Sequence, residues 1–208
     1  IGVGSPGSCR LPDGYDRALA DRQAEDFLEA LYEEADRWVV DLRGNPGGAV
    51  TGVVQAVGYV LGSREVGYAL DRRGNLSVWR PNALLAGESG LIQEPLVVLV
   101  DANSASAAEL FTAAMRDYGY GLIIGTRTFG KGVAQNVFGQ ADGSAFKITT
   151  ERYYSPNYVT PDRSGVLPHL VVDANLADEV ARLLCGTAEE QASGDVLVLQ
   201  LAGQTWYI

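Results

Sequence analysis

The chain has 208 residues and a mass of 22.2 kDa, the size of one large domain or of one domain with a small appendage. Hydrophobic residues make up 47% and charged residues 20% of the sequence, an ordinary globular composition that excludes a disordered or collagen-like chain. The formal net charge of -10 repels phosphate, so neither nucleic acid nor an anionic membrane is expected as the primary partner.

No apolar run approaches the roughly 20 residues that span a bilayer, since the longest run, 96–100, is strand-sized. The sequence begins at Ile1 without a signal-like start, so we expect a processed or excised piece in which any targeting signal is no longer visible. Cys9 and Cys185 are either a disulfide or two free thiols, and neither has the spacing of a metal site.

The first third of the chain is predicted to alternate helices with a strand. Residues 1–17 are rich in Gly and Pro and indicate an irregular or strand-like entry. Apolar residues recur at helical spacing over 19–35 and again over 50–61. Between these helices, a strand over 38–42 ends in a loop at 43–48.

The middle of the chain continues this pattern. Short apolar segments at 66–70 and 76–79 flank a polar turn and predict a hairpin. Residues 96–100 predict a buried parallel strand because they are apolar without polar alternation. A helix over 106–118 and a third buried strand over 122–124 follow.

The last third is predicted to be mostly β structure. Strands are expected at 133–138 and 145–153, where Phe146 and Ile148 alternate with polar residues. A Pro-rich loop at 155–168 leads to a helix at 175–185.

Strands and helices that alternate in this way predict an α/β core. We expect one domain over 1–186. Residues 187–208 are expected to be a linker and a C-terminal β segment, over 196–208, that starts a further unit.

Three loops that follow buried strands are candidates for a functional site. In the first, Asp41-Leu-Arg-Gly-Asn-Pro-Gly-Gly48, adjacent glycines let backbone N–H groups converge at a helix N-terminus. Such a turn can bind an anion or an oxyanion. A tight connection that needs left-handed φ values explains the same glycines without any site.

In the second loop, Ser106 and Glu109 form the S-x-x-E pattern of a capping box before an apolar helix. A serine at this position also has its hydroxyl beside unpaired N–H groups and the positive end of the helix dipole. An oxyanion formed by its attack would be stabilised there.

The third loop, Gly125-Thr-Arg-Thr-Phe-Gly-Lys-Gly132, nearly matches the phosphate-binding pattern G-x-x-x-x-G-K-[ST]. Gly132 replaces the magnesium-binding hydroxyl, and a strand rather than a helix is predicted to follow, so we do not expect a nucleotide site. The pattern still places Lys131 between two glycines. The alternative to a functional role is that Lys131 is an ordinary exposed residue of a loop.

The single histidine, His169, limits the available chemistry. A Ser-His-Asp or Cys-His enzyme, or a two-His metal site, would depend on it alone. A neutral lysine can replace histidine as the base if desolvation lowers its pKa from about 10.4 to about 7–8. Lys131 could be packed in that way, and Gln135 could hold its amine through a hydrogen bond.

Together these loops resemble the tail-specific, or C-terminal processing, serine peptidases. The resemblance rests on four motifs that span 41–156 in the family's order: Asp41-Leu-Arg-x-Asn-Pro-Gly-Gly48, Ser104-Ala-Ser-Ala-x-Glu109, Thr128-Phe-Gly-Lys-Gly-x-x-Gln135 and, more weakly, Arg152-Tyr-Tyr-Ser-Pro156. It implies an α/β fold with a crotonase/Clp-protease-like β-β-α spiral core and flanking β segments. The implied activity is that of a serine endopeptidase that forms an acyl-enzyme on protein or peptide substrates, without a metal or cofactor.

The resemblance also implies a role for each motif residue. The nucleophile falls on Ser106 and the general base on Lys131, at the family's usual separation, and the lysine-orienting glutamine falls on Gln135. The oxyanion hole would combine the N–H of Ala107 with one from the turn Gly47-Gly48, where we favour Gly48.

Two features depart from the family pattern. A PDZ domain usually precedes the first motif, and the 40 residues before Asp41 are too few for one. We therefore expect either that a PDZ domain has been cut away or that the chain belongs to a branch without one. Gly165-Val-Leu-Pro-His169 ends in histidine where the family often has aspartate. We expect His169 to be a structural or surface residue, and we expect a structural role for Asp117, which matches an acidic position of some members.

Other functions stay open. One is a non-catalytic ligand- or peptide-binding module on the same fold, which the intact Ser106, Lys131 and Gln135 argue against. Another is a crotonase-type acyl-CoA enzyme, whose polyphosphate ligand an acidic surface does not favour. The resemblance suggests an extracytoplasmic location, in the cell envelope or secreted, and a homo-oligomer is left open.

Overall fold

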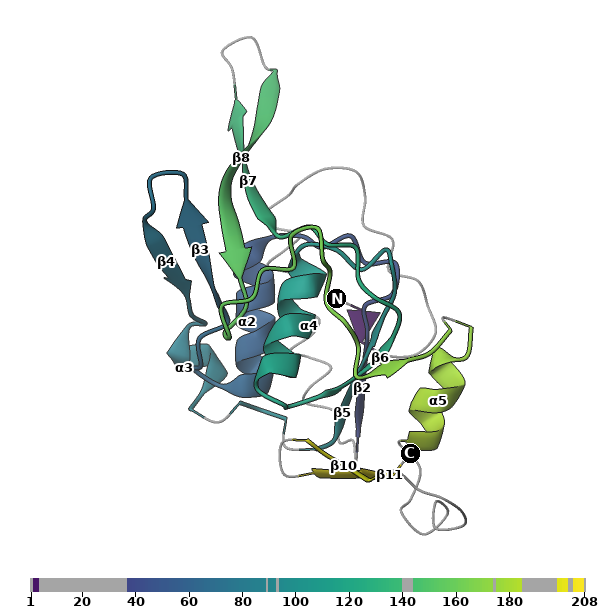
Figure 1. Cartoon of the computed structure of the whole chain (residues 1–208). Helices are drawn as coiled ribbons and strands as arrows, with labels where there is room; N and C mark the ends of the chain where they lie inside the picture. Colours follow the sequence, from purple (N-terminus) through teal and green to yellow (C-terminus); the bar gives the residue numbers. More distant parts are fainter. Residues whose placement is uncertain are drawn as a thin grey trace.

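The computed structural model describes residues 2–3, 37–88, 90–92, 94–139, 144–173, 175–184, 198–201 and 204–207. In this part of the chain, two main sheets and the helices packed on them form the body of the molecule (Figure 1). The helix expected over 19–35, both cysteines and the expected boundary at 186/187 lie outside the described residues.

The first sheet has the strand order β1-β2-β5-β6-β9. Its strands are β1 (Gly2–Val3), β2 (Trp38–Asp41), β5 (Leu96–Val100), β6 (Leu122–Gly125) and β9 (Leu170–Val171). β2, β5, β6 and β9 run parallel, and β1 is antiparallel to β2. The three buried strands expected from the sequence are therefore confirmed, and they lie side by side.

β5 is buried along its whole length, which explains why its sequence lacks polar alternation. Val98 and Val100 belong to the core formed with helices α2 (Val50–Leu61) and α4 (Ala107–Asp117). Val97 and Leu99 pack with helix α5 (Ala177–Leu184). Figure 1 shows α2 and α4 on one side of this sheet and α5 on the other, so the predicted α/β core is confirmed.

The second sheet is antiparallel, with the strand order β4-β3-β8-β7. Its strands are β3 (Gly67–Asp71), β4 (Leu76–Trp79), β7 (Val133–Gly139) and β8 (Ala145–Tyr154). The hairpin predicted from 66–79 is confirmed. Tyr153 and Trp79 from this sheet pack into the core shared by α2 and α4.

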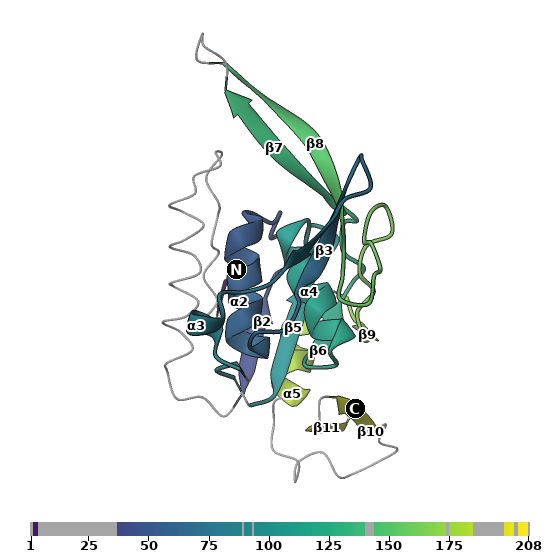
Figure 2. The ribbon, with the colours of Figure 1, turned by 90° about the vertical axis from the view of Figure 1, so that its left-hand side faces the viewer.

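Beyond this core, β7 and β8 extend as a long hairpin away from the body, here called the arm (Figures 1 and 2). The alternation of Phe146 and Ile148 correctly predicted a strand, but these side chains are 46% and 45% exposed. Phe146 stacks on Phe138 of β7 with ring centroids 5.7 Å apart. The apolar stripe of β8 thus lies on the surface of the arm and not in the core.

The smaller elements complete the described fold. The sequence patterns did not predict the short helix α3 (Ala83–Ala86) or β9. β10 (Val198–Leu201) and β11 (Gln204–Tyr207) pair as a separate antiparallel hairpin. None of the helices in the described ranges has the length and apolar character that crossing a membrane requires.

Candidate active site

The three loops singled out in the sequence meet at one edge of the first sheet. They follow β2, β5 and β6, which are neighbouring parallel strands, so their carboxyl ends lie together. The loop after β6 leads into β7 and not into a helix, which removes the structural context that a phosphate-binding loop requires.

Hydrogen bonds tie these loops to one another. The Ala105 N–H donates to the Asn45 carbonyl at 2.9 Å, and the Phe129 N–H donates to the Ser104 carbonyl at 3.0 Å. The buried Ser104 hydroxyl donates to the Leu42 carbonyl at 2.6 Å. The Ser104–Glu109 motif is therefore held between the other two loops.

Ser106 has an unusual backbone conformation. It precedes α4 with φ 57° and ψ -115°, a region that costs on the order of 1–3 kcal/mol for a residue with a side chain. Such strain persists where the surroundings enforce it, and it clusters at functional sites. A serine on a strained turn between a strand and a helix is the geometry that exposes a nucleophilic hydroxyl.

Gly47 lies directly against Ser106. Its φ is +91°, and a Cβ built on it would lie 2.8 Å from Ser106 Cβ and 2.7 Å from the Ala107 nitrogen. The Gly47 N–H already donates to Asn45 Oδ1 at 2.9 Å. No described residue accepts a hydrogen bond from the N–H of Gly48 or Ala107, so these two groups are available to a ligand beside Ser106.

Glu109 connects the serine loop with the lysine loop. Its carboxylate is fully buried and accepts hydrogen bonds from the N–H groups of Ser106 at 2.9 Å, Gly130 at 2.7 Å and Lys131 at 2.8 Å. The Thr128 hydroxyl donates to it at 2.6 Å. A carboxylate satisfied by four donors fixes the backbone at Ser106 and Lys131 relative to each other.

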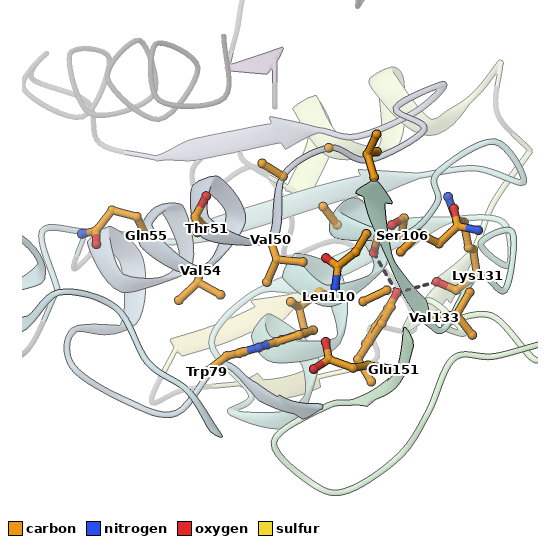
Figure 3. Close-up of a pocket in the computed structure, with 18 of the residues that line it drawn as sticks. Val50, Thr51, Val54, Gln55, Trp79, Ser106, Leu110, Lys131, Val133 and Glu151 are labelled. Atoms are coloured by element: carbon orange, nitrogen blue, oxygen red, sulfur yellow. Dashed lines mark hydrogen bonds between the residues drawn. The ribbon is translucent and has the colours of Figure 1, made fainter. Parts of the chain in front are cut away.

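Tyr153 connects the same two residues from the opposite sheet. Its hydroxyl lies 2.8 Å from the carbonyl oxygens of both Ser106 and Lys131, as the dashed lines in Figure 3 show. Burial, with the nearby charges of Glu109 and Asp162, raises the pKa of Tyr153 well above its usual range. The hydroxyl therefore stays protonated and remains a hydrogen-bond donor.

The amine of Lys131 lies in an environment that disfavours its charged form. Burial lowers the pKa of Lys131, the positive charge of Lys147 lowers it further, and the carboxylate of Glu109 opposes both effects. The amine forms no hydrogen bond or ion pair with any described residue, Ser106 included.

Gln135 also lies at this site, but with a different partner from the one expected. Its Nε2 donates to Thr149 Oγ1 of β8 at 3.2 Å, and no hydrogen bond joins it to Lys131 within the described residues. The cause is the antiparallel pairing of β7 with β8, which sets Gln135 opposite Thr149.

A cavity of about 770 Å³ brings the predicted residues together (Figure 3). The lining includes Ser106, Ala107, Gly48, Lys131 and Gln135, whereas Gly47 is not part of it and lies against Ser106 and Ala107. Its remaining walls come from the start of α2, the end of β4, and strands β7 and β8. The serine, the lysine and the two residues whose N–H groups are available therefore line one cavity.

His169 and Asp117 have structural partners, as expected. The His169 ring Nδ1 accepts the Ile123 N–H at 3.0 Å, and burial lowers the pKa of His169. Asp117 Oδ2 accepts the Asn157 N–H at 2.9 Å. Neither residue lines the cavity.

Sequence reasoning missed three contributors to the site. Glu109 was interpreted only as a cap, because its contacts with the lysine loop come from chain more than 20 residues away. Tyr153 lies within the weaker motif Arg152–Pro156, which could have indicated it. Lys147 is the one lysine of the chain besides Lys131, and nothing in its local sequence marks it as part of the site.

The fold and site define an α/β protein in which one cavity joins a strained serine at a helix N-terminus to a partly buried lysine. Residues 9–172 match the model of peptidase family S41. The chain belongs to this family, and the resemblance found in its motifs is confirmed.

Relatives in sequence are longer proteins. The chain is 34% identical over 168 residues to carboxyl-terminal-processing peptidase 3, chloroplastic, of Arabidopsis thaliana, covering 78% of this chain and 32% of that protein. It is 30% identical over 181 residues to a carboxyl-terminal-processing protease of Synechocystis sp. (strain ATCC 27184 / PCC 6803 / Kazusa), covering 86% and 41%. The chain thus spans well under half the length of these relatives.

Solved structures share the fold. A photosystem II D1 C-terminal processing protease superposes with a TM-score of 0.65 at 29% identity, over 84% of this chain and 45% of that chain. A lipoprotein from Streptococcus agalactiae superposes with a TM-score of 0.70 at 16% identity, over 82% and 61%, and shows likeness in fold alone.

Proposed function

We propose that this chain carries the catalytic site of a serine endopeptidase that cleaves polypeptides through a Ser106/Lys131 dyad. The observation that carries the proposal is the shared cavity, in which the strained Ser106 and the partly buried Lys131 lie beside two available N–H groups. Membership of peptidase family S41 and the names of the relatives support it.

In the proposed reaction, the neutral amine of Lys131 takes the proton of the Ser106 hydroxyl as Oγ attacks a peptide carbonyl carbon. The negative charge that develops on the carbonyl oxygen accepts hydrogen bonds from the N–H groups of Ala107 and Gly48. The lysine then gives the proton to the departing amine, and an ester to Ser106 remains. A water molecule then attacks the ester carbonyl as the same lysine takes its proton. The bond between the carbonyl carbon and Ser106 Oγ breaks, the lysine returns the proton to Oγ, and the carboxylic acid product leaves.

The mechanism requires the lysine to reach the serine. The four-carbon side chain of Lys131 can rotate inside the cavity, and catalytic hydrogen bonds often tighten only when substrate is bound. The backbone beneath both residues is already fixed by Glu109 and Tyr153. Gln135 would orient the amine through its Oε1, since its Nε2 is used by Thr149.

We propose C-terminal processing of protein substrates as the biological form of this activity, because the relatives carry that name. An extracytoplasmic setting is proposed with it.

The test is to replace each member of the dyad. Ser106→Ala and Lys131→Ala should each lower kcat/KM for an unstructured peptide by at least about 10³ while the melting temperature changes by no more than a few degrees. Circular dichroism and a fluorogenic cleavage assay measure both quantities. Near wild-type cleavage by either variant would overturn the mechanism.

A further inference from the structure

The two donors of the candidate oxyanion hole come from different loops. The Gly48 N–H belongs to the loop after β2, and the Ala107 N–H begins α4 directly after the loop that follows β5. Such donors stabilise a developing negative charge only while both lie about 2.7–3.1 Å from the position of the oxyanion. The relative position of the two loops therefore decides whether the hole is assembled.

Asp101, the residue after β5, binds both loops through one carboxylate oxygen. Its Oδ1 accepts the Gly44 N–H of the loop after β2 at 2.9 Å. The same oxygen accepts the N–H groups of Asn103 and Ser104 in its own loop, at 2.9 Å and 3.0 Å. Hydrogen bonds to an ionised acceptor are stronger than those between neutral groups, so this oxygen attaches the two loops firmly to each other.

Further hydrogen bonds between the loops start from residues that Asp101 holds in place. The Asp101 N–H donates to Ser104 Oγ at 2.9 Å, and the Ser104 hydroxyl donates to the Leu42 carbonyl at 2.6 Å. Ala105, next in the chain, donates its N–H to the Asn45 carbonyl at 2.9 Å. These bonds therefore depend on the same aspartate as the bond to the first loop described above.

The remaining surroundings of Asp101 indicate no other role for its carboxylate. Asp101 does not line the cavity, and no lysine or arginine of the described ranges forms an ion pair with it. Its second oxygen, Oδ2, accepts no hydrogen bond from the described residues. The side chain therefore holds the loops without contacting a substrate bound in the cavity.

We propose that Asp101 is a positioning residue that sets the distance between the two N–H groups of the oxyanion hole. It acts through Gly44 on the turn that ends at Gly48, and through Ser104 on the start of α4. The inference rests on the proposed peptidase function, because the hole matters only in a reaction that forms an oxyanion. Loosening the loops should slow the chemical step without weakening the binding of the ground-state substrate.

The test separates the bond between the loops from the turn within one loop. In Asp101→Ser, the hydroxyl still accepts the Asn103 N–H two residues on, as serine does in ST turns, but is too short to reach Gly44. This variant should lower kcat for an unstructured peptide by about tenfold or more and leave KM within about twofold of wild type.

A conservative variant provides the rescue. Asp101→Asn keeps Oδ1 and places the amide nitrogen where Oδ2 has no hydrogen-bond partner among the described residues. The bonds between the loops are then retained, although the acceptor is no longer ionised. Asp101→Asn should therefore keep kcat within about threefold of wild type.

Asp71 offers a matched control in the other sheet. It ends β3, and its Oδ1 accepts the N–H groups of Arg73 at 2.7 Å and Asn75 at 2.9 Å within a turn. None of these three residues lines the cavity. Asp71→Ser should therefore lower the melting temperature by a few degrees, as Asp101→Ser does, and leave kcat unchanged.

Amide NMR signals report on the loops without any need for cleavage. In the isotope-labelled whole chain, Asp101→Ser should shift the amide signals of Gly48 and Ala107, whereas Asp71→Ser should not. This readout applies even if the wild-type chain cleaves nothing, so a failure of the peptidase mechanism is distinguishable from a failure of this inference.

A second variant keeps the inference testable if Asp101→Ser does not fold. Ser104→Ala leaves the carboxylate in place and removes the dependent bond to the Leu42 carbonyl, so kcat should fall while KM holds.

Three results would overturn the proposal. An increase in KM at unchanged kcat would mean that the loops act on substrate binding. An unchanged kcat in Asp101→Ser, as in Asp71→Ser, would leave Asp101 with a purely structural role. Unmoved amide signals of Gly48 and Ala107 would mean that the two donors do not depend on Asp101.

Discussion

The pKa of Lys131 is subject to opposing effects. Burial and the positive charge of Lys147 both lower its pKa, while the buried carboxylate of Glu109 raises it. A general base must be neutral to accept a proton, so activity should increase with pH until the amine has lost its proton. Lys147 is exposed on β8, opposite Val137, and lines the same cavity. It therefore acts on Lys131 at a distance.

This arrangement gives a pH prediction. Lys147→Gln removes a positive charge, so the pKa of Lys131 should rise toward its ordinary value of 10.5. The ascending limb of kcat/KM against pH should shift to higher pH, and activity at pH 7 should fall by about two- to fivefold. Lys147→Arg keeps the charge and serves as the control, with an unshifted limb. An equal loss at every pH would mean that Lys147 contacts substrate and does not tune the base.

At the scale of elements, the turn between β2 and α2 supports the serine. Gly47 adopts φ +91° and leaves no room for a Cβ next to Ser106 and Ala107. α4 begins at Ala107, so the same contact also positions the first N–H of that helix. One glycine thereby aligns the candidate nucleophile with one donor of the candidate oxyanion hole.

Gly47→Ala should therefore impair both stability and catalysis. The strained φ and the contact with Ser106 Cβ together should lower the free energy of unfolding by about 2–4 kcal/mol and kcat by about 10² or more. Gly74→Ala is the matched control, because Gly74 has φ +86° with nothing within 4 Å of its Cβ. That variant should lose about 1–2 kcal/mol of stability and no activity. Thermal unfolding and peptide cleavage are measured for both variants. Equal activity of Gly47→Ala and Gly74→Ala would contradict the role given to Gly47.

At the scale of the whole molecule, the site depends on both sheets. The first sheet supplies three loops at the ends of parallel strands. These loops were predictable because each buried strand, and each loop rich in Gly and Pro, is identified by residues that are adjacent in the sequence. Ser106, Lys131 and the glycine turn were found in this way. The cavity that joins them also needs Tyr153 and Trp79 from the second sheet, whose contacts with the first are long-range.

The features that the sequence did not reveal have related causes. Period-two alternation identifies a strand but not whether its apolar face is covered, so Phe146 and Ile148 are exposed on the arm despite their spacing. Gln135 bonds to Thr149 because strand register, which no local pattern encodes, sets the two residues opposite each other. β9 has only two residues, and it is defined by its pairing with β6, which no local sequence pattern shows.

The most direct measurement is covalent labelling of the wild-type chain with a fluorophosphonate, followed by mapping of the modified residue by tandem mass spectrometry. A serine activated by a neutral lysine should give one adduct, on Ser106, and the labelling rate should fall by at least about 10² in Lys131→Ala. Absence of an adduct, or an adduct on Ser106 that forms equally fast without the Lys131 amine, would contradict the dyad.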